Sequence, residues 1–299
     1  MISMPVHDIF KPEDANFYTI KHACPRFKSM PVHGFTLVEL VTVLVVLGIV
    51  SVGIAGFIRT GTDIYVDVIE RDQLLSEGRF AAERLNREIR NAVPNSVRVA
   101  GDTTIQCIEF VPVLFSSFYF DIPVAPETAS DEVKLVATTA STTDYTYQAG
   151  HSIVVYPTAV TDIYDTSSKR FLLGSAPILD PDDNKKLLIT LDAPVQFATD
   201  SPSSRAYVVD NPVSYCVTNN QILRFAGYGY NSTQSTTLTD GILMAENLEN
   251  DLAGEQQDKP FRLSEATLTR NAFVVVLLRF ELNEELVVFN NEVHIPNAP

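Results

Sequence analysis

The carboxylate of Glu39 interrupts an otherwise uncharged apolar stretch at residues 35–58. As a helix rising about 1.5 Å per residue, this stretch is long enough to cross the roughly 30 Å hydrocarbon core of a bilayer. An ionised side chain within such a span costs about 2.5–3.5 kcal/mol on insertion scales, and less near the helix end. Because a buried carboxylate is stabilised by a cationic partner, the position of Glu39 indicates a function that supplies one.

Three interpretations compete for this segment. A cleaved secretory signal peptide would use Gly53 and Ala55 as its small residues and be cut before Gly56. Its apolar run would then be about 20 residues, longer than the usual 7–15, and would contain an ionisable group. A plain signal anchor would keep the helix in the membrane and make Glu39 incidental. The third interpretation comes from the residues at the start of the helix.

The motif GFTLVE at residues 34–39, directly followed by an apolar helix, closely resembles the class III signal of type IV pilins and type II secretion pseudopilins. The resemblance implies that a prepilin peptidase cuts between Gly34 and Phe35 on the cytoplasmic side and then N-methylates Phe35. It also implies that Glu39 pairs, during assembly, with the terminal amine of a neighbouring subunit. Cleavage at this point would keep the helix as an anchor and create the cation that the carboxylate needs.

We therefore expect a cleaved leader at residues 1–34, the transmembrane half of a long helix at 35–59 and a periplasmic head at 60–299. The protein should be a single-pass inner-membrane protein, and incorporation into a surface pilus is a further expectation. Met-Pro-Val-His occurs both after Ser3 and at the end of the leader. The sequence leaves open whether translation starts at Met1, Met4 or Met30.

Beyond residue 59, apolar residues recur at helical spacing, and charged residues occupy the other faces. Pro94 should end this pattern, which predicts one helix over about 35–92. The amphipathic half of this helix needs a partner surface. The pattern of the rest of the chain predicts short strands separated by Pro, Gly, Asn and Ser/Thr clusters. The expected fold class is α+β, with the long helix packed on an antiparallel β-sheet head. The clearest expected strands lie at 104–111, 152–156, 186–190, 213–218, 221–225, 273–282 and 286–294, with a tight turn at Asn219-Asn220 and loops around 126–150, 158–170 and 231–260.

Three later stretches resemble minor pilins of the mannose-sensitive haemagglutinin (MSHA) pilus: RNAVPNSVR at 90–98, DNPVSYC at 210–216 and HIPN at 294–297. The helix-plus-sheet layout is also similar to the J-type pseudopilins and the W-type minor pilins. The resemblance implies a minor pilin or pseudopilin that is assembled into a filament or primes one. Two alternatives remain: a J-like pseudopilin of type II secretion, and a periplasmic binding protein or enzyme anchored by a pilin signal.

The partners implied are prepilin peptidase, other pilins, the inner-membrane assembly platform and membrane lipid. Nucleic acid is not expected as a partner, because the net charge is −15, with 22 Lys+Arg against 37 Asp+Glu and no basic stripe. Cys24 lies in the leader, which leaves Cys107 and Cys216 on expected strands of the processed chain. The oxidising periplasm permits a disulfide between them, and the alternative is two independent buried thiols.

No catalytic constellation or cofactor motif is recognisable. His151 and His294 are far apart, and no Cys/His spacing predicts zinc. Residues 180–184 begin like a calcium loop, but Lys185 replaces the turn glycine and Leu191 the bidentate glutamate, which favours a solvated acidic turn. There is no G-x-S-x-G elbow, P-loop or dinucleotide fingerprint. The sequence therefore predicts no cofactor, no metal site and no enzyme.

Overall fold

The computed structural model describes residues 34–165, 168–266, 270–283 and 285–295. Most of the expected leader lies outside these residues, as do Cys24, the candidate start methionines and the last two residues of the HIPN motif. The chain divides between Thr60 and Gly61 into two compact units.

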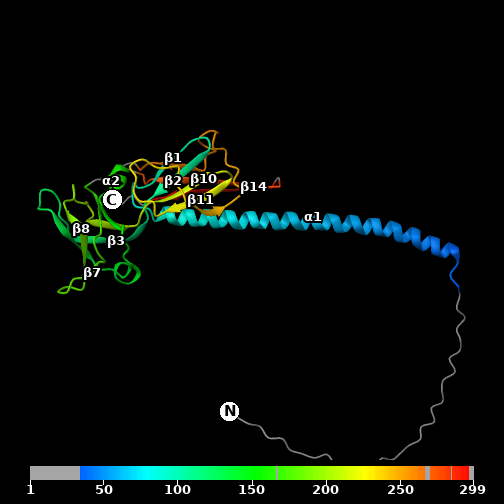
Figure 1. Ribbon diagram of the computed structural model, residues 1–299, viewed down its shortest axis with the longest axis horizontal. Helices are drawn as coiled ribbons and strands as arrows, with labels where there is room; N and C mark the ends of the chain where they lie inside the picture. Colours follow the sequence, from blue (N-terminus) through cyan, green and yellow to red (C-terminus); the bar gives the residue numbers. More distant parts are fainter. Residues whose placement is uncertain (1–33, 166–167, 267–269, 284, 296–299) are drawn as a thin grey trace, which may run out of the picture. The chain divides into compact units, whose positions relative to one another are not determined.

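The expected long helix is α1, Leu37–Arg90, which continues through the division between the units (Figure 1). At its C-terminal end, Asn91 N–H donates to Glu88 O and Ala92 N–H to Ile89 O, both at 3.1 Å. Val93 N–H then donates to Val111 O at 2.9 Å. The chain has therefore left the helix and bonded to Val111 before Pro94, whose ring could not have continued the helix.

Two antiparallel sheets of the second unit flank the C-terminal half of α1. The five-stranded sheet has the order β1-β2-β10-β11-β12 and the three-stranded sheet the order β13-β14-β15. Asn219 and Asn220, with φ of 48° and 60°, form the turn between β10 and β11, so the expected tight turn is confirmed. The strand bounds are β1 Arg98–Gly101, β2 Ile105–Phe110, β10 Val213–Thr218, β11 Gln221–Ala226, β12 Ile242–Ala245, β13 Phe261–Ser264, β14 Phe273–Leu282 and β15 Glu285–His294.

One hydrophobic core joins α1 to both of these sheets. The helix contributes Leu74, Leu85 and Ile89, all buried on one face, whereas Ile64 and Val68, which belong to the apolar stripe expected from the sequence, are exposed. Tyr215 on β10 and Phe280 on β14 are fully buried in the same cluster. The amphipathic half of α1 is thus an integral part of the head.

A third sheet has seven strands, in the order β6-β5-β9-β3-β4-β8-β7. The segment that follows β6 pairs with β8: Leu173 forms a β-bridge with Leu191, and Gly174 N–H donates to Thr190 O at 2.9 Å. The sheet thereby closes into a small barrel whose interior is filled by buried side chains such as Phe197. The barrel elements are β3 Val113–Asp121, β4 Ser130–Val136, η1 Ala140–Asp144, β5 Ser152–Val155, α2 Thr161–Tyr164, β6 Arg170–Leu172, β7 Ile178–Leu179, β8 Lys186–Val195 and β9 Arg205–Val209.

The barrel is an insertion between two neighbouring strands. β2 and β10 pair directly, and the barrel is the part of the chain that connects them. Asp210 N–H donates to Pro112 O at 3.1 Å, so the chain enters and leaves the barrel at one point. The barrel is also held against the head, since Tyr164 donates its hydroxyl to Ser96 O at 2.9 Å and lies under the Arg98 guanidinium at 3.6 Å.

The structure confirms the α+β fold with a long helix packed on antiparallel sheets. The expectation of loops around 126–150, 158–170 and 231–260 was wrong in part, because these segments contain β4, the short helix α2 and β12 respectively. In β4, the buried Val133 and Leu135 alternate with charged and exposed residues. A strand with one face in a small barrel and the other in water is therefore as polar in composition as a loop.

Candidate processing and assembly site

The residues of the GFTLVE motif occupy the start of α1. Gly34, Phe35 and Thr36 precede the first helical residue, Leu37. Thr36 caps the helix: its Oγ1 accepts the Glu39 N–H at 3.3 Å, and its carbonyl accepts the Leu40 N–H at 3.2 Å. This cap was not among the features expected from the sequence, although Thr-x-x-Glu before an apolar run is the signature of a capping box.

Glu39 therefore lies in the first turn of α1. A carboxylate at this end of a helix interacts favourably with the unpaired N–H groups and the positive end of the helix dipole. A free amine at Phe35 would place a positive charge at the same end, where the dipole disfavours it. A carboxylate such as that of Glu39 on an adjacent chain would offset this cost.

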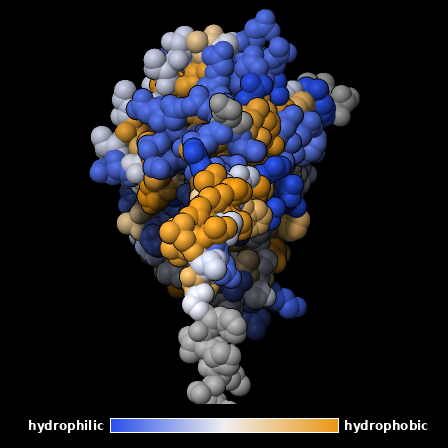
Figure 2. All heavy atoms as spheres, turned by 90° about the vertical axis from the view of Figure 1, so that its right-hand side faces the viewer, coloured by the Kyte–Doolittle hydropathy of each residue, from blue (hydrophilic) through white to orange (hydrophobic). Residues whose placement is uncertain are grey.

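The first unit offers an apolar surface to its surroundings. Phe35 is 76% and Leu37 79% exposed, and hydrophobic side chains cover the visible surface of the N-terminal part of α1 (Figure 2). α1 is long and apolar enough to cross a membrane. Its hydroxyl groups are satisfied within the helix, because Ser51 donates to Leu47 O at 2.7 Å and Thr60 to Gly56 O at 3.1 Å. Such internal bonds remove the cost of placing a hydroxyl in hydrocarbon.

Gly34 is sterically open in this structure. A Cβ atom added to Gly34 would meet no atom within 4 Å. The fold of the chain does not require glycine at this position. Any requirement for glycine would therefore come from the enzyme that binds this segment. A requirement for glycine would then reflect close approach of the peptidase to the backbone.

Cys107 and Cys216 are joined by a disulfide with an S–S distance of 2.05 Å. The two residues lie directly opposite each other on β2 and β10, and both side chains are fully buried. β2 and β10 are the strands that lead into and out of the barrel. The disulfide therefore closes the base of the insertion.

The two histidines lie in different parts of the head. His151 is buried beside the barrel strand β5, and its Nδ1 lies 2.8 Å from the Tyr145 hydroxyl. Burial lowers the pKa of His151, and Asp210, with Oδ1 3.8 Å from Nε2, opposes this shift. His294 is exposed on β15. Within the described ranges, no group of three or more His, Cys, Asp or Glu side chains is placed to hold a metal ion.

The acidic segment at 180–184 uses its carboxylates to stabilise its own turn. Asp180 Oδ1 accepts the Asp182 N–H at 2.9 Å, and Asp183 Oδ1 accepts the Lys185 N–H at 3.1 Å. Lys186 Nζ lies 3.4 Å from the Asp183 carboxylate. The segment is an acidic turn between β7 and β8.

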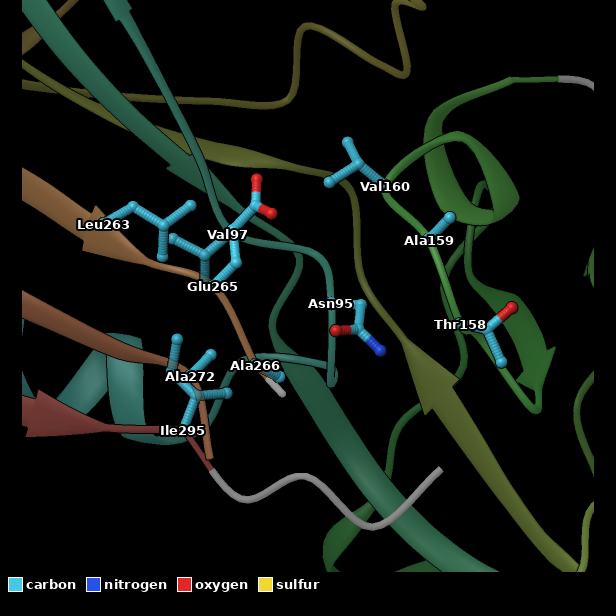
Figure 3. A pocket seen from close by; sticks show the side chains of 10 residues that line it. All are labelled: Asn95, Val97, Thr158, Ala159, Val160, Leu263, Glu265, Ala266, Ala272 and Ile295. Atoms are coloured by element: carbon cyan, nitrogen blue, oxygen red, sulfur yellow. The ribbon is translucent and has the colours of Figure 1, made fainter. Parts of the chain in front are cut away.

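A cavity of about 280 Å³ lies between the head sheets and the barrel (Figure 3). Its polar lining residues are Asn95, Thr158 and Glu265, each from a different segment. The Asn95 amide donates to Pro157 O at 3.0 Å, and the Thr158 hydroxyl donates to Asp162 at 2.9 Å. Two of the three polar side chains are thus already hydrogen-bonded to other parts of the protein.

Comparison with known families locates one match. Residues 30–55 match the family model described as the prokaryotic N-terminal methylation motif, which covers the GFTLVE motif and most of the apolar half of α1. The chain thus carries a type IV pilin-like class III signal on a helix suited to single-pass membrane anchoring. This finding supports a type IV pilin-like or pseudopilin-like protein and implies processing by prepilin peptidase. No curated protein and no solved structure matches the chain.

Proposed function

We propose that this protein is a minor pilin of an MSHA-like type IV pilus. Prepilin peptidase cuts it after Gly34 and methylates Phe35, and the processed subunit is then incorporated into the filament or primes it. The observation that carries the proposal is the class III signal at the start of α1. The stretches at 90–98 and 210–216, which resemble the MSHA minor pilin MshO, favour a pilus over a secretion system.

The fold gives this proposal a physical basis. The helix that carries the signal also supplies Leu74, Leu85 and Ile89 to the core of the head. The signal and part of the core of the head therefore belong to one continuous helix. Pairing of Glu39 with the terminal amine of a neighbour is the proposed step that draws subunits together, and the head is proposed to lie in the periplasm.

A J-like pseudopilin of type II secretion is the related alternative. It would use the same signal and the same pairing of Glu39 with an amine, so the choice between them depends on the filament in which the subunit is found. Recovery of the protein in purified surface pili supports the pilus. Recovery only with the secretion machinery would overturn the MSHA assignment and leave the pseudopilin.

A periplasmic binding protein or enzyme anchored by a pilin signal is the alternative from another class. The cavity in Figure 3 is the feature that favours it, because Asn95, Thr158 and Glu265 give it a partly polar lining. Removing the Glu265 carboxylate by Glu265→Gln separates the two functions. A filament subunit should keep its incorporation unchanged, whereas a ligand-binding protein should lose ligand.

The decisive experiment is mass spectrometry of the mature N-terminus, on full-length protein recovered from the envelope. We expect a chain that begins at Phe35 and carries one added methyl group. A chain that begins at Gly56 would be an exported protein released from its signal peptide, and this result would overturn the proposal. An uncut chain that still carries residues 1–34 would leave only a plain membrane anchor.

A further inference from the structure

The strand β15 is a long, regular edge of the three-stranded sheet. It has ten residues and pairs with β14 from Leu282↔Glu285 to Phe273↔His294 without a shift of register. Within the part of the chain that the structure describes, no strand pairs with its other side. The backbone groups on that side are consequently available to a partner.

The hydrogen-bond pattern shows which residues these are. Ile295 donates its N–H to Ala272 O at 2.9 Å, and this pair continues the register of β14 and β15. In an antiparallel ladder, opposed residues alternate between those that exchange hydrogen bonds and those that do not. The odd-numbered residues of β15 therefore bond to β14, and the even-numbered residues direct N–H and C=O to the open edge.

Hydrogen bonds on the other side of β14 independently identify the same even-numbered residues of β15. The N–H groups of Leu277 and Glu281 donate away from β15, to Pro260 O and Asn247 O, both at 2.9 Å. Their partners on β15 are Asn290 and Leu286, which are even-numbered. All five residues of the open edge are also exposed, namely Leu286, Val288, Asn290, Glu292 and His294.

The other edges of the head are shorter than this one. β1, β12 and β13 have four residues each, and the pairing of β12 with β11 is interrupted by a register shift. Proteins usually protect edge strands by short length, bulges, proline or charged side chains, lysine above all. The sequence of β15, ELVVFNNEVH, has neither proline nor lysine, the strand has no bulge, and its acidic residues are Glu285 and Glu292.

We propose that β15 binds an extended segment of a different subunit of the filament, which adds a strand to the three-stranded sheet. A row of N–H and C=O groups at strand spacing is complementary to another extended backbone. The exposed side chains specify the partner further: Leu286 and Val288 favour apolar residues at one end of the segment, whereas at the other end Glu292 already has the His294 imidazole 3.1 Å away. The partner is a different chain because β15 paired with its own copy makes a closed two-fold dimer, which a growing filament cannot use.

This inference rests on the proposed filament function, and photo-crosslinking in the full-length protein in cells tests it. Val288→p-benzoylphenylalanine places a reactive side chain at the open edge, and Leu172→p-benzoylphenylalanine, at an exposed apolar position on the barrel, is the matched control. We expect Val288 to form an adduct with a segment of another filament subunit, identified by mass spectrometry, and the control to form none. An adduct only with the same chain, or no adduct, would overturn the proposal.

A backbone variant tests the hydrogen bonds themselves. Asn290→Pro removes an N–H from the open edge without removing a bond to β14, and Asn290→Ala removes the side chain alone. We expect the proline variant to lose most of its adduct and of its co-purification with filament subunits, while the alanine variant keeps both. Equal melting temperatures would show that the proline variant is folded. If both variants assemble equally well, the edge is not used.

The two proposals can fail separately. A wild-type chain that is cut at Phe35 and recovered in filaments, but forms no adduct at Val288, refutes only the strand pairing. A wild-type chain that is not cut there refutes the filament function, whatever is crosslinked at β15.

Discussion

At the level of single residues, Thr36 and Glu39 share the start of α1 but act through different atoms. The Thr36 hydroxyl accepts a backbone N–H, which Glu39 supplies whatever its side chain is. The Glu39 carboxylate is not needed for that bond. Capping and charge can therefore be separated by substitution.

Glu39→Val should leave cleavage after Gly34 and membrane insertion largely intact while impairing assembly with other pilins. The substitution removes the carboxylate that would pair with a neighbour's amine but keeps the cap. Thr36→Val is the matched control, because it removes a cap worth about 1 kcal/mol and keeps the charge. Co-purification with the other pilins and a blot for the cleaved form measure both steps. Normal assembly of Glu39→Val would show that the carboxylate is incidental.

His151 should make the stability of the head depend on pH. Burial lowers the pKa of its imidazole, and Asp210 opposes this shift. Below the ordinary histidine pKa of about 6.5, the unfolded chain takes up a proton that the folded chain binds less well, so stability should fall as the pH falls. Urea unfolding between about pH 7.5 and pH 5.5 measures this slope.

His151→Gln should flatten that slope, because glutamine does not titrate. His294→Gln, at an exposed position on β15, is the control for removing a histidine that is not buried. If wild type and His151→Gln lose stability in parallel as the pH falls, groups other than His151 cause the dependence.

At the level of elements, Gly78 allows α1 to pack closely against the three-stranded sheet. A Cβ atom at this position would lie 2.3 Å from the Phe289 ring and 3.0 Å from the Phe280 ring. The two rings already make an edge contact, with centroids 5.9 Å apart. The crossing of helix and sheet thus depends on a residue without a side chain.

Gly78→Ala should destabilise the head by about 1–3 kcal/mol, because the rings must move to admit the methyl group. In an exposed helix the same substitution is stabilising by about 1 kcal/mol. Gly61→Ala, in the same helix with no atom within 4 Å of the added Cβ, should show that ordinary gain. Urea unfolding of both variants measures the difference. A gain at Gly78 equal to that at Gly61 would show that the Phe289 ring moves aside at no cost.

The elements that the sequence predicted well are those with a local signal. The long helix follows from apolar spacing, and β10 and β14 match the expected 213–218 and 273–282. The barrel was not predicted, because its closure depends on contacts such as Leu173 with Leu191 that local periodicity does not contain. The site shows the same division: the charge of Glu39 is conspicuous in the sequence, whereas the edge of β15 exists only once β14 is paired.

At the level of the whole molecule, the disulfide joins the two strands between which the barrel is inserted. Cys107 and Cys216 lie 109 positions apart in sequence, yet they face each other at the base of the insertion. A cross-link that closes so long a loop restricts the unfolded chain strongly. The bond therefore stabilises the head and fixes the two strands from which the barrel leaves.

Cys107→Ala and Cys216→Ala should each lower the free energy of unfolding by about 2–5 kcal/mol, and the double variant should lose no more than either single variant. Non-reducing peptide mapping of the wild-type protein should yield one linked pair of peptides. Two freely alkylatable thiols in the folded protein would refute the bridge in solution.

The position of the barrel has a consequence for how such a protein can change. Asp210 N–H and Pro112 O are 3.1 Å apart, so everything between them replaces what could have been a short turn between β2 and β10. A gene that exchanged this stretch for another domain with adjacent termini would keep the signal, the anchor and the helix core intact. The head can thus carry different inserted domains between β2 and β10. The surface of the inserted domain can change while the residues used for processing stay the same.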